Sequence, residues 1–291
     1  MKQACIFPGQ GAQLPGMGKE LYDSNDKAKE LFEQANEILG FRITDIMFGD
    51  DPDALMATKV TQPAVFLHSA VAALCNNIHP DMAAGHSLGE FSALAAAGVL
   101  SLEDALTLVS VRALAMQKCC EKIPGAMAAI IGADQSLIEE TCEKVEGTVV
   151  AANYNCDTQV VISGEDAAVD AVIEILGQAG VRKIVKLKVG GAFHSPLMEP
   201  ARAELAQAID RIHFHTPICP VYQNVDGLSH TSPSTIKENL LQQLTSPVYW
   251  TSTIRNMVSD GATSFKVIGP GQVLQGLNRK IVPEIETLTL S

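Results

Sequence analysis

The sequence contains no long hydrophobic run: no apolar stretch reaches the ~18 residues that a membrane-spanning helix needs. The first apolar segment, residues 4–7, is also far too short for the core of a signal peptide. There is no C-x-x-C motif, and seven cysteines are an odd number, which disfavours a complete disulfide framework. We therefore expect no membrane span, reduced thiols and a cytoplasmic location.

Basic residues are scarce relative to acidic ones. The chain has 21 Lys and Arg against 33 Asp and Glu, a formal net charge of -12. This balance argues against nucleic acid as the main partner, because binding to phosphates needs a positive surface. A local basic surface remains possible. Residues 182–202 contain one acid, Glu199, and five bases: Arg182, Lys183, Lys186, Lys188 and Arg202.

The composition is that of a globular chain. Hydrophobic residues make up 47% and charged residues 19% of the 291 positions, which excludes a disordered protein. The first part alternates short apolar strands with helices, such as 26–39 and 61–76, the latter with Thr61 as its N-cap and Pro63 in its first turn. After Pro124-Gly125 the pattern changes to βαββαβ. We predict an α/β fold: a large hydrolase-like domain with a parallel sheet (1–123 and 191–291) and an inserted ferredoxin-like α+β subdomain (124–190).

The segment Gly85-His86-Ser87-Leu88-Gly89 matches the G-x-S-x-G pattern of a nucleophile elbow. A small-residue strand (82–85) precedes it and an apolar helix (89–98) follows it. Such a turn exposes the serine hydroxyl at a helix N-terminus, whose dipole favours a developing negative charge. The alternative is a glycine-capped turn with a surface serine.

A serine nucleophile needs a base, and His194 is the best candidate among the histidines. It lies in the glycine-containing segment 190–196, where the predicted insertion rejoins the large domain, and interdomain clefts often hold ligand sites. His86 adjoins Ser87, so we expect its side chain to point away from the hydroxyl. A loop histidine without a role is the alternative for His194.

Arg112 lies in the helix 102–120, which is apolar almost all round. A guanidinium in such a helix needs an anionic partner or several acceptors. A structural ion pair or a side chain that extends to the surface would satisfy it. A substrate carboxylate held by two hydrogen bonds would satisfy it as well. The segment 7–11 adds a strand followed by a glycine loop, which suits an oxyanion hole or an ordinary turn.

Together these motifs resemble the malonyl-CoA:acyl carrier protein transacylases of bacterial fatty acid synthesis, and they are similar to the acyltransferase domains of polyketide synthases. The resemblance covers nearly the whole chain. Besides Arg112, it rests on Phe-Pro-Gly-Gln-Gly at 7–11, Thr-Gln-Pro-Ala at 61–64, Gly-His-Ser-Leu-Gly-Glu at 85–90, Gly-Ala-Met-Ala-Ala-Ile at 125–130, Asn-Tyr-Asn at 153–155, Ala-Phe-His-Ser at 192–195 and Gly-Pro-Gly at 269–271.

The resemblance implies a role for each matching residue. Ser87 would be the nucleophile and His194 its general base, with a main-chain carbonyl, placed at Tyr249, orienting the imidazole. The other implied residues are Gln10 and Leu88 (oxyanion hole, through their backbone N–H groups), Arg112 (the malonyl carboxylate), and Gln62, Asn155 and Phe193 (the pocket, with Phe193 typical of malonyl users).

The resemblance also implies a ping-pong transfer from malonyl-CoA, through an acyl-serine, to the phosphopantetheine thiol of an acyl carrier protein. It implies a monomer with no bound cofactor or metal. The basic residues of 182–202 are candidates for docking the acidic carrier or the CoA phosphates, with a solvated strand edge as the alternative. Three other functions remain open: a serine hydrolase, a trans-acting acyltransferase of a polyketide pathway, and a non-catalytic docking protein.

Overall fold

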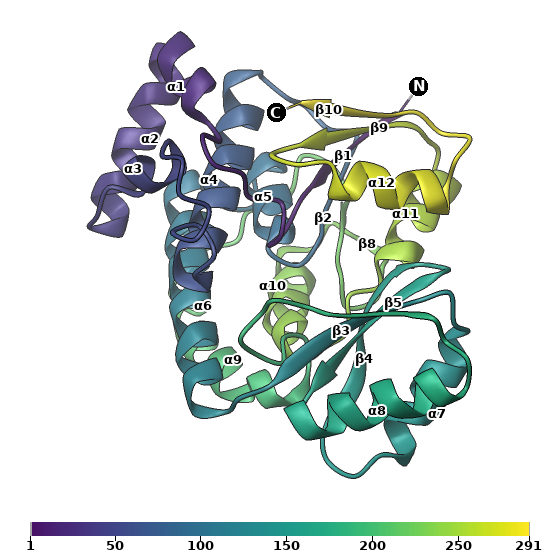
Figure 1. The fold of residues 1–291 in the computed structure, drawn as a ribbon. Coiled ribbons are helices and arrows are strands. Elements are labelled where there is room, and N and C mark those ends of the chain that lie inside the picture. Colours follow the sequence, from purple (N-terminus) through teal and green to yellow (C-terminus); the bar gives the residue numbers. More distant parts are fainter. Residues whose placement is uncertain (1, 291) are drawn as a thin grey trace.

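Two β-sheets organise the computed structural model, which describes residues 2–290 (Figure 1). Within these residues the larger sheet has six strands in the order β10-β9-β1-β2-β7-β8, and all neighbours are parallel except β7 and β8. The predicted α/β fold with a parallel sheet is therefore confirmed. The strands are β1 (Lys2–Phe7), β2 (Met82–Gly85), β7 (Val221–Tyr222), β8 (Ser229–His230), β9 (Ala262–Ile268) and β10 (Thr287–Leu290).

Helices cover both faces of this sheet. They are α1 (Lys19–Ser24), α2 (Asp26–Leu39), α3 (Ile43–Met47), α4 (Thr58–Cys75), α5 (Gly89–Ala96), α6 (Leu102–Lys122), α9 (Glu199–Ile209), α10 (Pro233–Gln242), α11 (Trp250–Ser259) and α12 (Val273–Ile281). Cys5 and Phe7 of β1 enter a core shared with α2, α4, α5 and α6, whereas Ala4 and Ile6 enter a core shared with α11 and α12. The two-residue period of a strand produces this alternation. Figure 1 shows the two helix groups on opposite sides of β1.

The second sheet has the predicted βαββαβ order. Its four strands within residues 2–290 lie in the order β4-β5-β3-β6, and each neighbouring pair is antiparallel. The elements are β3 (Ala126–Ile131), α7 (Gln135–Lys144), β4 (Val149–Cys156), β5 (Gln159–Gly164), α8 (Asp166–Gln178) and β6 (Lys183–Lys186). The division of the chain into a large domain (1–123 and 191–291) and an inserted subdomain (124–190) stays a prediction.

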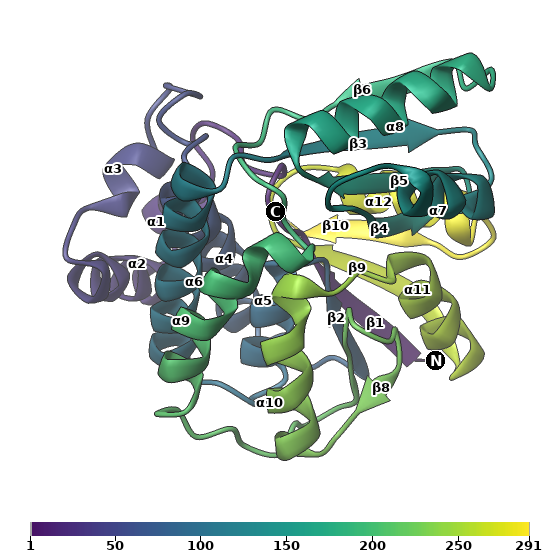
Figure 2. The ribbon, with the colours of Figure 1, turned by 90° about the horizontal axis from the view of Figure 1, so that it is seen from below.

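The two faces of the second sheet have different neighbours. Ala128 and Ile130 of β3 pack with α7 and α8, and Figure 2 shows α8 on the outer side of this sheet, away from α9. Met127 and Ala129 face the other way and pack with Met116 of α6 and with Phe193. The segment that carries His194 therefore lies between the second sheet and the helices of the first.

One helix begins earlier than the sequence predicts. α4 starts at Thr58, with Ala57 as its N-cap, so the prediction that Thr61 caps it is wrong. The Thr61 hydroxyl instead donates to the carbonyl oxygen of Ala57 (3.1 Å) and contacts that of Leu55. Pro63 then lies inside the helix, beyond the first turn, where its missing N–H leaves one helical carbonyl without its usual donor. The cap was misplaced because Ala57 has no side chain that signals a helix start.

Two expectations from the sequence concern the cysteines and membrane-spanning helices. All seven cysteines, which lie within residues 2–290, are free thiols. Along the same residues, no helix combines the length and the apolar character needed to cross a membrane.

Candidate active site

Ser87 lies at a sharp turn between β2 and α5. Its φ of 52° is in the left-handed region, which residues with a side chain rarely adopt. A Cβ atom on Gly85 would lie 1.9 Å from the carbonyl carbon of Gly89, and one on Gly89 would lie 2.1 Å from the carbonyl oxygen of Phe7. Only glycine fits either position, so the local sequence forces the elbow and exposes the Ser87 hydroxyl at the carboxyl edge of the sheet.

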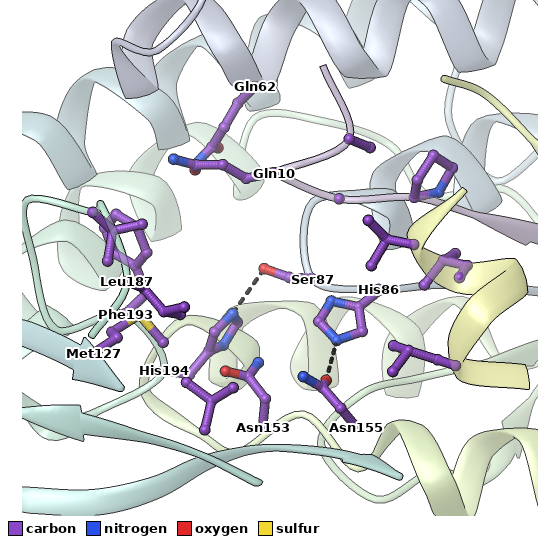
Figure 3. A pocket seen from close by; sticks show the side chains of 18 of the residues that line it. Gln10, Gln62, His86, Ser87, Met127, Asn153, Asn155, Leu187, Phe193 and His194 are labelled. Atoms are coloured by element: carbon purple, nitrogen blue, oxygen red, sulfur yellow. Dashed lines mark hydrogen bonds between the residues drawn. The ribbon is translucent and has the colours of Figure 1, made fainter. Parts of the chain in front are cut away.

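Ser87 and His194 point toward each other (Figure 3), with Oγ and Nε2 2.7 Å apart. The other ring nitrogen, Nδ1, lies 2.9 Å from the carbonyl oxygen of Gln243. A carbonyl oxygen only accepts, so Nδ1 carries the hydrogen and Nε2 is free to accept the serine proton. Burial, together with the positive charge of Arg112, lowers the pKa of His194 to about 3. The imidazole is therefore a neutral base at pH 7.

The orienting carbonyl belongs to Gln243, so the prediction of Tyr249 is wrong. Tyr249 is the N-cap of α11, and its carbonyl oxygen accepts hydrogen bonds from the backbone N–H and the hydroxyl of Thr253. Gln243 begins the one-turn 3₁₀ helix η2 (Gln243–Thr245), where the main chain gives its carbonyl oxygen one long hydrogen bond, of 3.4 Å from Ser246 N. That carbonyl keeps an open lone pair for the imidazole, whereas the one at Tyr249 is used by its own helix.

Arg112 is 1% exposed, and its acceptors are all uncharged. Nη1 donates to Gln62 Oε1 (2.7 Å), while Nη2 donates to Ser87 Oγ (3.1 Å) and to Gln243 Oε1 (3.3 Å). Within residues 2–290 no acid lies within ion-pair distance of it. Burial lowers the pKa of Arg112 to about 10, an effect that the charge of Glu90 opposes, so the guanidinium stays protonated at neutral pH. A structural ion pair therefore does not explain this residue.

Two backbone N–H groups in the loops next to Ser87 have no acceptor of their own among the described residues: that of Leu88, the following residue, and that of Gln10, which lines the same cleft as Ser87. Between residues 2 and 290, neither the Gln10 nor the Leu88 N–H donates a hydrogen bond to the protein. Leu88 is the N-cap of α5, and Gln10 follows β1, which is paired with β2. Free N–H groups at a helix start can receive the oxygen of a tetrahedral intermediate.

A cleft of about 190 Å³ opens above these groups, between the two sheets (Figure 3). The residues predicted for the pocket, Gln62, Asn155 and Phe193, all line it. Gln62 Nε2 donates to Gln10 Oε1 (3.3 Å), which connects the Arg112 acceptor with the loop after β1. Asn155 Oδ1 lies 2.8 Å from His86 Nε2, so His86 is turned away from the Ser87 hydroxyl, as its position predicted. The remaining lining residues are Pro8, Gly9, Gln10, Ala12, His86, Ser87, Arg112, Met116, Met127, Asn153, Gln159, Val161, Leu187, Val189, His194, Val273, Leu274 and Leu277.

Comparison with known proteins identifies the family. The model of the acyl transferase domain matches residues 4–283. The chain belongs to this family. The match spans the elbow, His194 and Arg112 alike, and it confirms the resemblance seen in the sequence motifs.

The relatives of this acyltransferase share one activity by name. The chain is 41% identical over 297 residues to the malonyl CoA-acyl carrier protein transacylase of Bacillus subtilis strain 168, covering 100% of this chain and 93% of that protein. The crystal structure of the malonyl-CoA:acyl carrier protein transacylase from Xanthomonas oryzae superposes with a TM-score of 0.95 at 38% identity, covering 99% of this chain and 94% of that one. A malonyl-transacylase in complex with a type II PKS acyl-carrier protein superposes with a TM-score of 0.95 at 34% identity, covering 100% and 96%.

Three residues beside the elbow of this acyltransferase are not among the predicted site residues: Glu90, Asn224 and Gln243. Each is at most 1% exposed. Glu90 could have been singled out from the sequence, because an acidic side chain in the otherwise apolar helix after the elbow is as unusual as Arg112 in its helix. Asn224 follows β7, at the carboxyl edge of the sheet, where functional side chains gather in parallel sheets. Gln243 had no such signal, since only the fold brings its turn to His194.

Proposed function

We propose that this acyltransferase moves a malonyl group from malonyl-CoA to the phosphopantetheine thiol of an acyl carrier protein, through an ester on Ser87. The observation that carries this proposal is the buried Arg112, whose Nη2 lies 3.1 Å from the nucleophile and whose partners are all neutral. Its charge is available for a substrate carboxylate, which a guanidinium holds with two hydrogen bonds. The names of the curated and solved relatives support the same substrate and acceptor.

In the first half of the reaction, Ser87 attacks the thioester carbonyl while His194 Nε2 takes the hydroxyl proton. The negative oxygen that forms is stabilised by the N–H groups of Gln10 and Leu88. Arg112 holds the far carboxylate and so places the thioester over the serine. The protonated His194 then gives its proton to the departing CoA sulfur, which leaves the malonyl ester on Ser87.

In the second half, the carrier's thiol enters the same cleft. His194 takes the thiol proton, the sulfur attacks the ester carbonyl, and the proton returns to Ser87 Oγ as the new thioester leaves. The pantetheine arm arrives with its carrier, so no cofactor held by this chain enters the proposal. We place the reaction in the cytoplasm, with the chain acting as a monomer.

Two other functions share parts of this site. A trans-acting acyltransferase of a polyketide pathway would use the same chemistry, and one solved relative is held in complex with such a carrier. A serine hydrolase would need the same nucleophile and base but would gain nothing from Arg112. The product separates it from a transferase: free malonate in the presence of a carrier protein would favour hydrolysis.

The decisive test is the acyl preference of an Arg112→Ala variant. Only malonyl-CoA carries the second carboxylate, so we expect acylation by malonyl-CoA to fall by roughly 10²–10³-fold and acylation by acetyl-CoA by less than tenfold, from the loss of one buried charge interaction. Intact-protein mass spectrometry with both thioesters measures the two rates on one preparation. The ratio of rates therefore cancels any partial misfolding.

Arg112→Lys is the matched control, because it keeps the charge but loses the planar fork. We expect it to retain part of the malonyl preference. Equal losses with both thioesters in Arg112→Ala would show that Arg112 is structural. Dominant release of malonate by the wild-type protein with carrier present would overturn the transferase proposal itself.

For carrier docking, the predicted basic residues are not equivalent. Lys186 lies 2.8 Å from Asp170 and 3.4 Å from Asp166, and Arg202 pairs with Glu199, so those two charges are locally offset. Within residues 2–290, Arg182, Lys183 and Lys188 have no ion pair. Lys188 is exposed and stands between Leu187 and Val189, which both line the cleft. We propose that these three bases attract an acidic carrier toward the cleft mouth, against the net charge of -12.

Reversing two of these charges should weaken carrier use. We expect Lys183→Glu/Lys188→Glu to raise the KM for the carrier by roughly three- to tenfold at low salt, and the difference to shrink in high salt because the charges are exposed and screened. Initial rates at several salt concentrations give this result. The control is Lys27→Glu/Lys29→Glu, the same charge change on exposed residues of α2, which lies away from β6 (Figure 2). Equal KM values for the two variants would assign docking to another surface.

A further inference from the structure

Glu90 is a buried acid that the mechanism does not use. Its side chain is fully buried, and both oxygens accept hydrogen bonds: Oε1 from Gln223 Nε2 (3.0 Å) and Oε2 from the Asn224 N–H (2.9 Å). Burial raises the pKa of Glu90, and the hydrogen bonds that its oxygens accept oppose this rise, because donors stabilise the ionised carboxylate. A buried carboxylate is costly to retain, so the group that it holds in place is of interest.

That group is Asn224, whose side chain contacts the elbow on both sides of His86. Its Oδ1 accepts the Ser87 N–H (2.7 Å), and its Nδ2 donates to the carbonyl oxygen of Gly85 (2.7 Å). The Asn224 carboxamide therefore provides hydrogen-bond partners for two main-chain groups of the turn, the Ser87 N–H and the Gly85 carbonyl oxygen. Asn224 is itself fully buried, so it has little freedom to adopt another rotamer.

The elbow needs such support because Ser87 is held at a φ of 52°. A residue in this region persists only when its surroundings determine it. Without the Asn224 amide, the Ser87 N–H loses its acceptor, and the turn can relax. Relaxation would change two things at once: the 2.7 Å contact of Ser87 Oγ with His194, and the direction of the next N–H, that of Leu88.

We propose that Asn224, held in orientation by Glu90, is the positioning residue of the nucleophile: it sets the rate of acylation of Ser87 and leaves substrate binding unchanged. The inference rests on the proposed role of Ser87 as nucleophile. Asn224 acts on the backbone of the turn, whereas Arg112 and the pocket residues hold the substrate. Its removal therefore lowers kcat rather than raising KM.

The test compares Asn224→Ala with Asn256→Ala. Asn256 is a matched control, because its Nδ2 likewise donates to a glycine carbonyl, that of Gly227 (2.9 Å), in another loop. We expect single-turnover acylation of Asn224→Ala to fall by roughly 30- to 100-fold, the cost of a misplaced reacting group, with KM within about threefold of wild type. The pH at half-maximal rate should not move, since His194 keeps its carbonyl partner. Asn256→Ala should acylate at the wild-type rate.

Each variant is assayed with malonyl-CoA and with p-nitrophenyl acetate. The second ester reads the reactivity of Ser87 whatever the natural acyl donor is. If the wild-type protein did not use malonyl-CoA, the proposed function would be rejected. A slower reaction of Asn224→Ala with p-nitrophenyl acetate would still support the positioning role. Equal rates for the two asparagine variants, or a raised KM with an unchanged rate, would overturn the positioning role.

Glu90→Gln keeps the test decisive should Asn224→Ala fail to fold. It preserves the volume but places an NH₂ group against a donor, either Gln223 Nε2 or the Asn224 N–H. Gln223 cannot turn its amide over without losing its bonds to Ile236 O and Asn239 Nδ2. We expect a loss of about five- to twentyfold in the acylation rate with both esters, again without a change in KM, because the carboxamide is misaligned and not removed. A wild-type rate in Glu90→Gln would overturn the part assigned to Glu90.

Discussion

Ser87→Ala is expected to form no malonyl-enzyme, with a fall of about 10⁵-fold or more in transfer to the carrier, the scale seen when a serine nucleophile is removed. The reason is geometric as well as chemical. The elbow presents one hydroxyl to His194 Nε2 at 2.7 Å and to Arg112 Nη2 at 3.1 Å. Mass spectrometry of the protein after exposure to malonyl-CoA measures the bound acyl group directly.

A buried serine outside the cleft is the control for that experiment. Ser163 of β5 is fully buried, and its hydroxyl has no hydrogen-bond partner within residues 2–290. Ser163→Ala removes a hydroxyl from the core and should leave labelling at the wild-type level. A Ser87→Ala protein that still becomes malonylated would assign the nucleophile to another residue, which peptide mapping would locate.

His194→Ala should slow both halves of the reaction, by about 10³–10⁴-fold, because the same nitrogen takes the proton from Ser87 and later from the carrier's thiol. Stopped-flow or quenched-flow measurement of acylation, and of transfer from pre-formed malonyl-enzyme, separates the two steps. His230→Ala is the control, since His230 pairs with Asp226 outside the cleft. A loss confined to one half-reaction would contradict a single shared base.

The pH profile gives His194 a second signature. Its pKa is lowered to about 3, chiefly by burial and also by Arg112, so the neutral base form persists well below pH 6.5. Activity that depends on a neutral base is present above the pKa and is lost as the pH falls through it. We expect kcat/KM for acylation to stay nearly flat between pH 7 and 5. A midpoint near 6.5, the unperturbed value, would show that the base lies in a solvated site.

The same electrostatics links the base to substrate choice. When His194 takes the serine proton, an imidazolium forms in a buried site beside the cationic Arg112, which opposes it. A carboxylate bound to Arg112 offsets that positive charge and makes the proton transfer easier. Malonyl-CoA brings such a group, whereas acetyl-CoA does not. In the proposed reaction, Arg112 therefore favours malonyl-CoA in two ways: it binds the carboxylate, and its uncompensated charge opposes proton transfer to His194 when no carboxylate is bound.

Much of the fold can be predicted from the sequence because its causes are local. The helix Asp26–Leu39, for example, has the bounds that its pattern predicts. The βαββαβ order of the second sheet is correct as well. The elbow is also local, since Gly85 and Gly89 are required by contacts within a few residues and with the neighbouring strand. The N-cap predicted at Thr61 shows the limit: a capping signal inside a longer helix misleads when the true start has no side-chain cap.

Other parts of the site depend on the tertiary structure. The helix α12 was not predicted, yet its residues Val273, Leu274 and Leu277 form one wall of the cleft. The carbonyl that orients His194 belongs to Gln243 and not to Tyr249 as predicted, because the sequence does not show which peptide oxygen is free to accept a hydrogen bond. The folded structure decides which carbonyl oxygen has a free lone pair close to His194 Nδ1.

By itself, the sequence determined the α/β fold, the glycine-flanked turn at Ser87, and the unusual position of Arg112 in an apolar helix, because residue types and short spacings encode these. Only the tertiary structure determined how the turn is held. Ser87 meets His194 across 107 positions and Asn224 across 137. Such contacts join one side chain to the backbone or hydroxyl of a distant segment. Their geometry arises only when the sheet has brought the ends of its strands together.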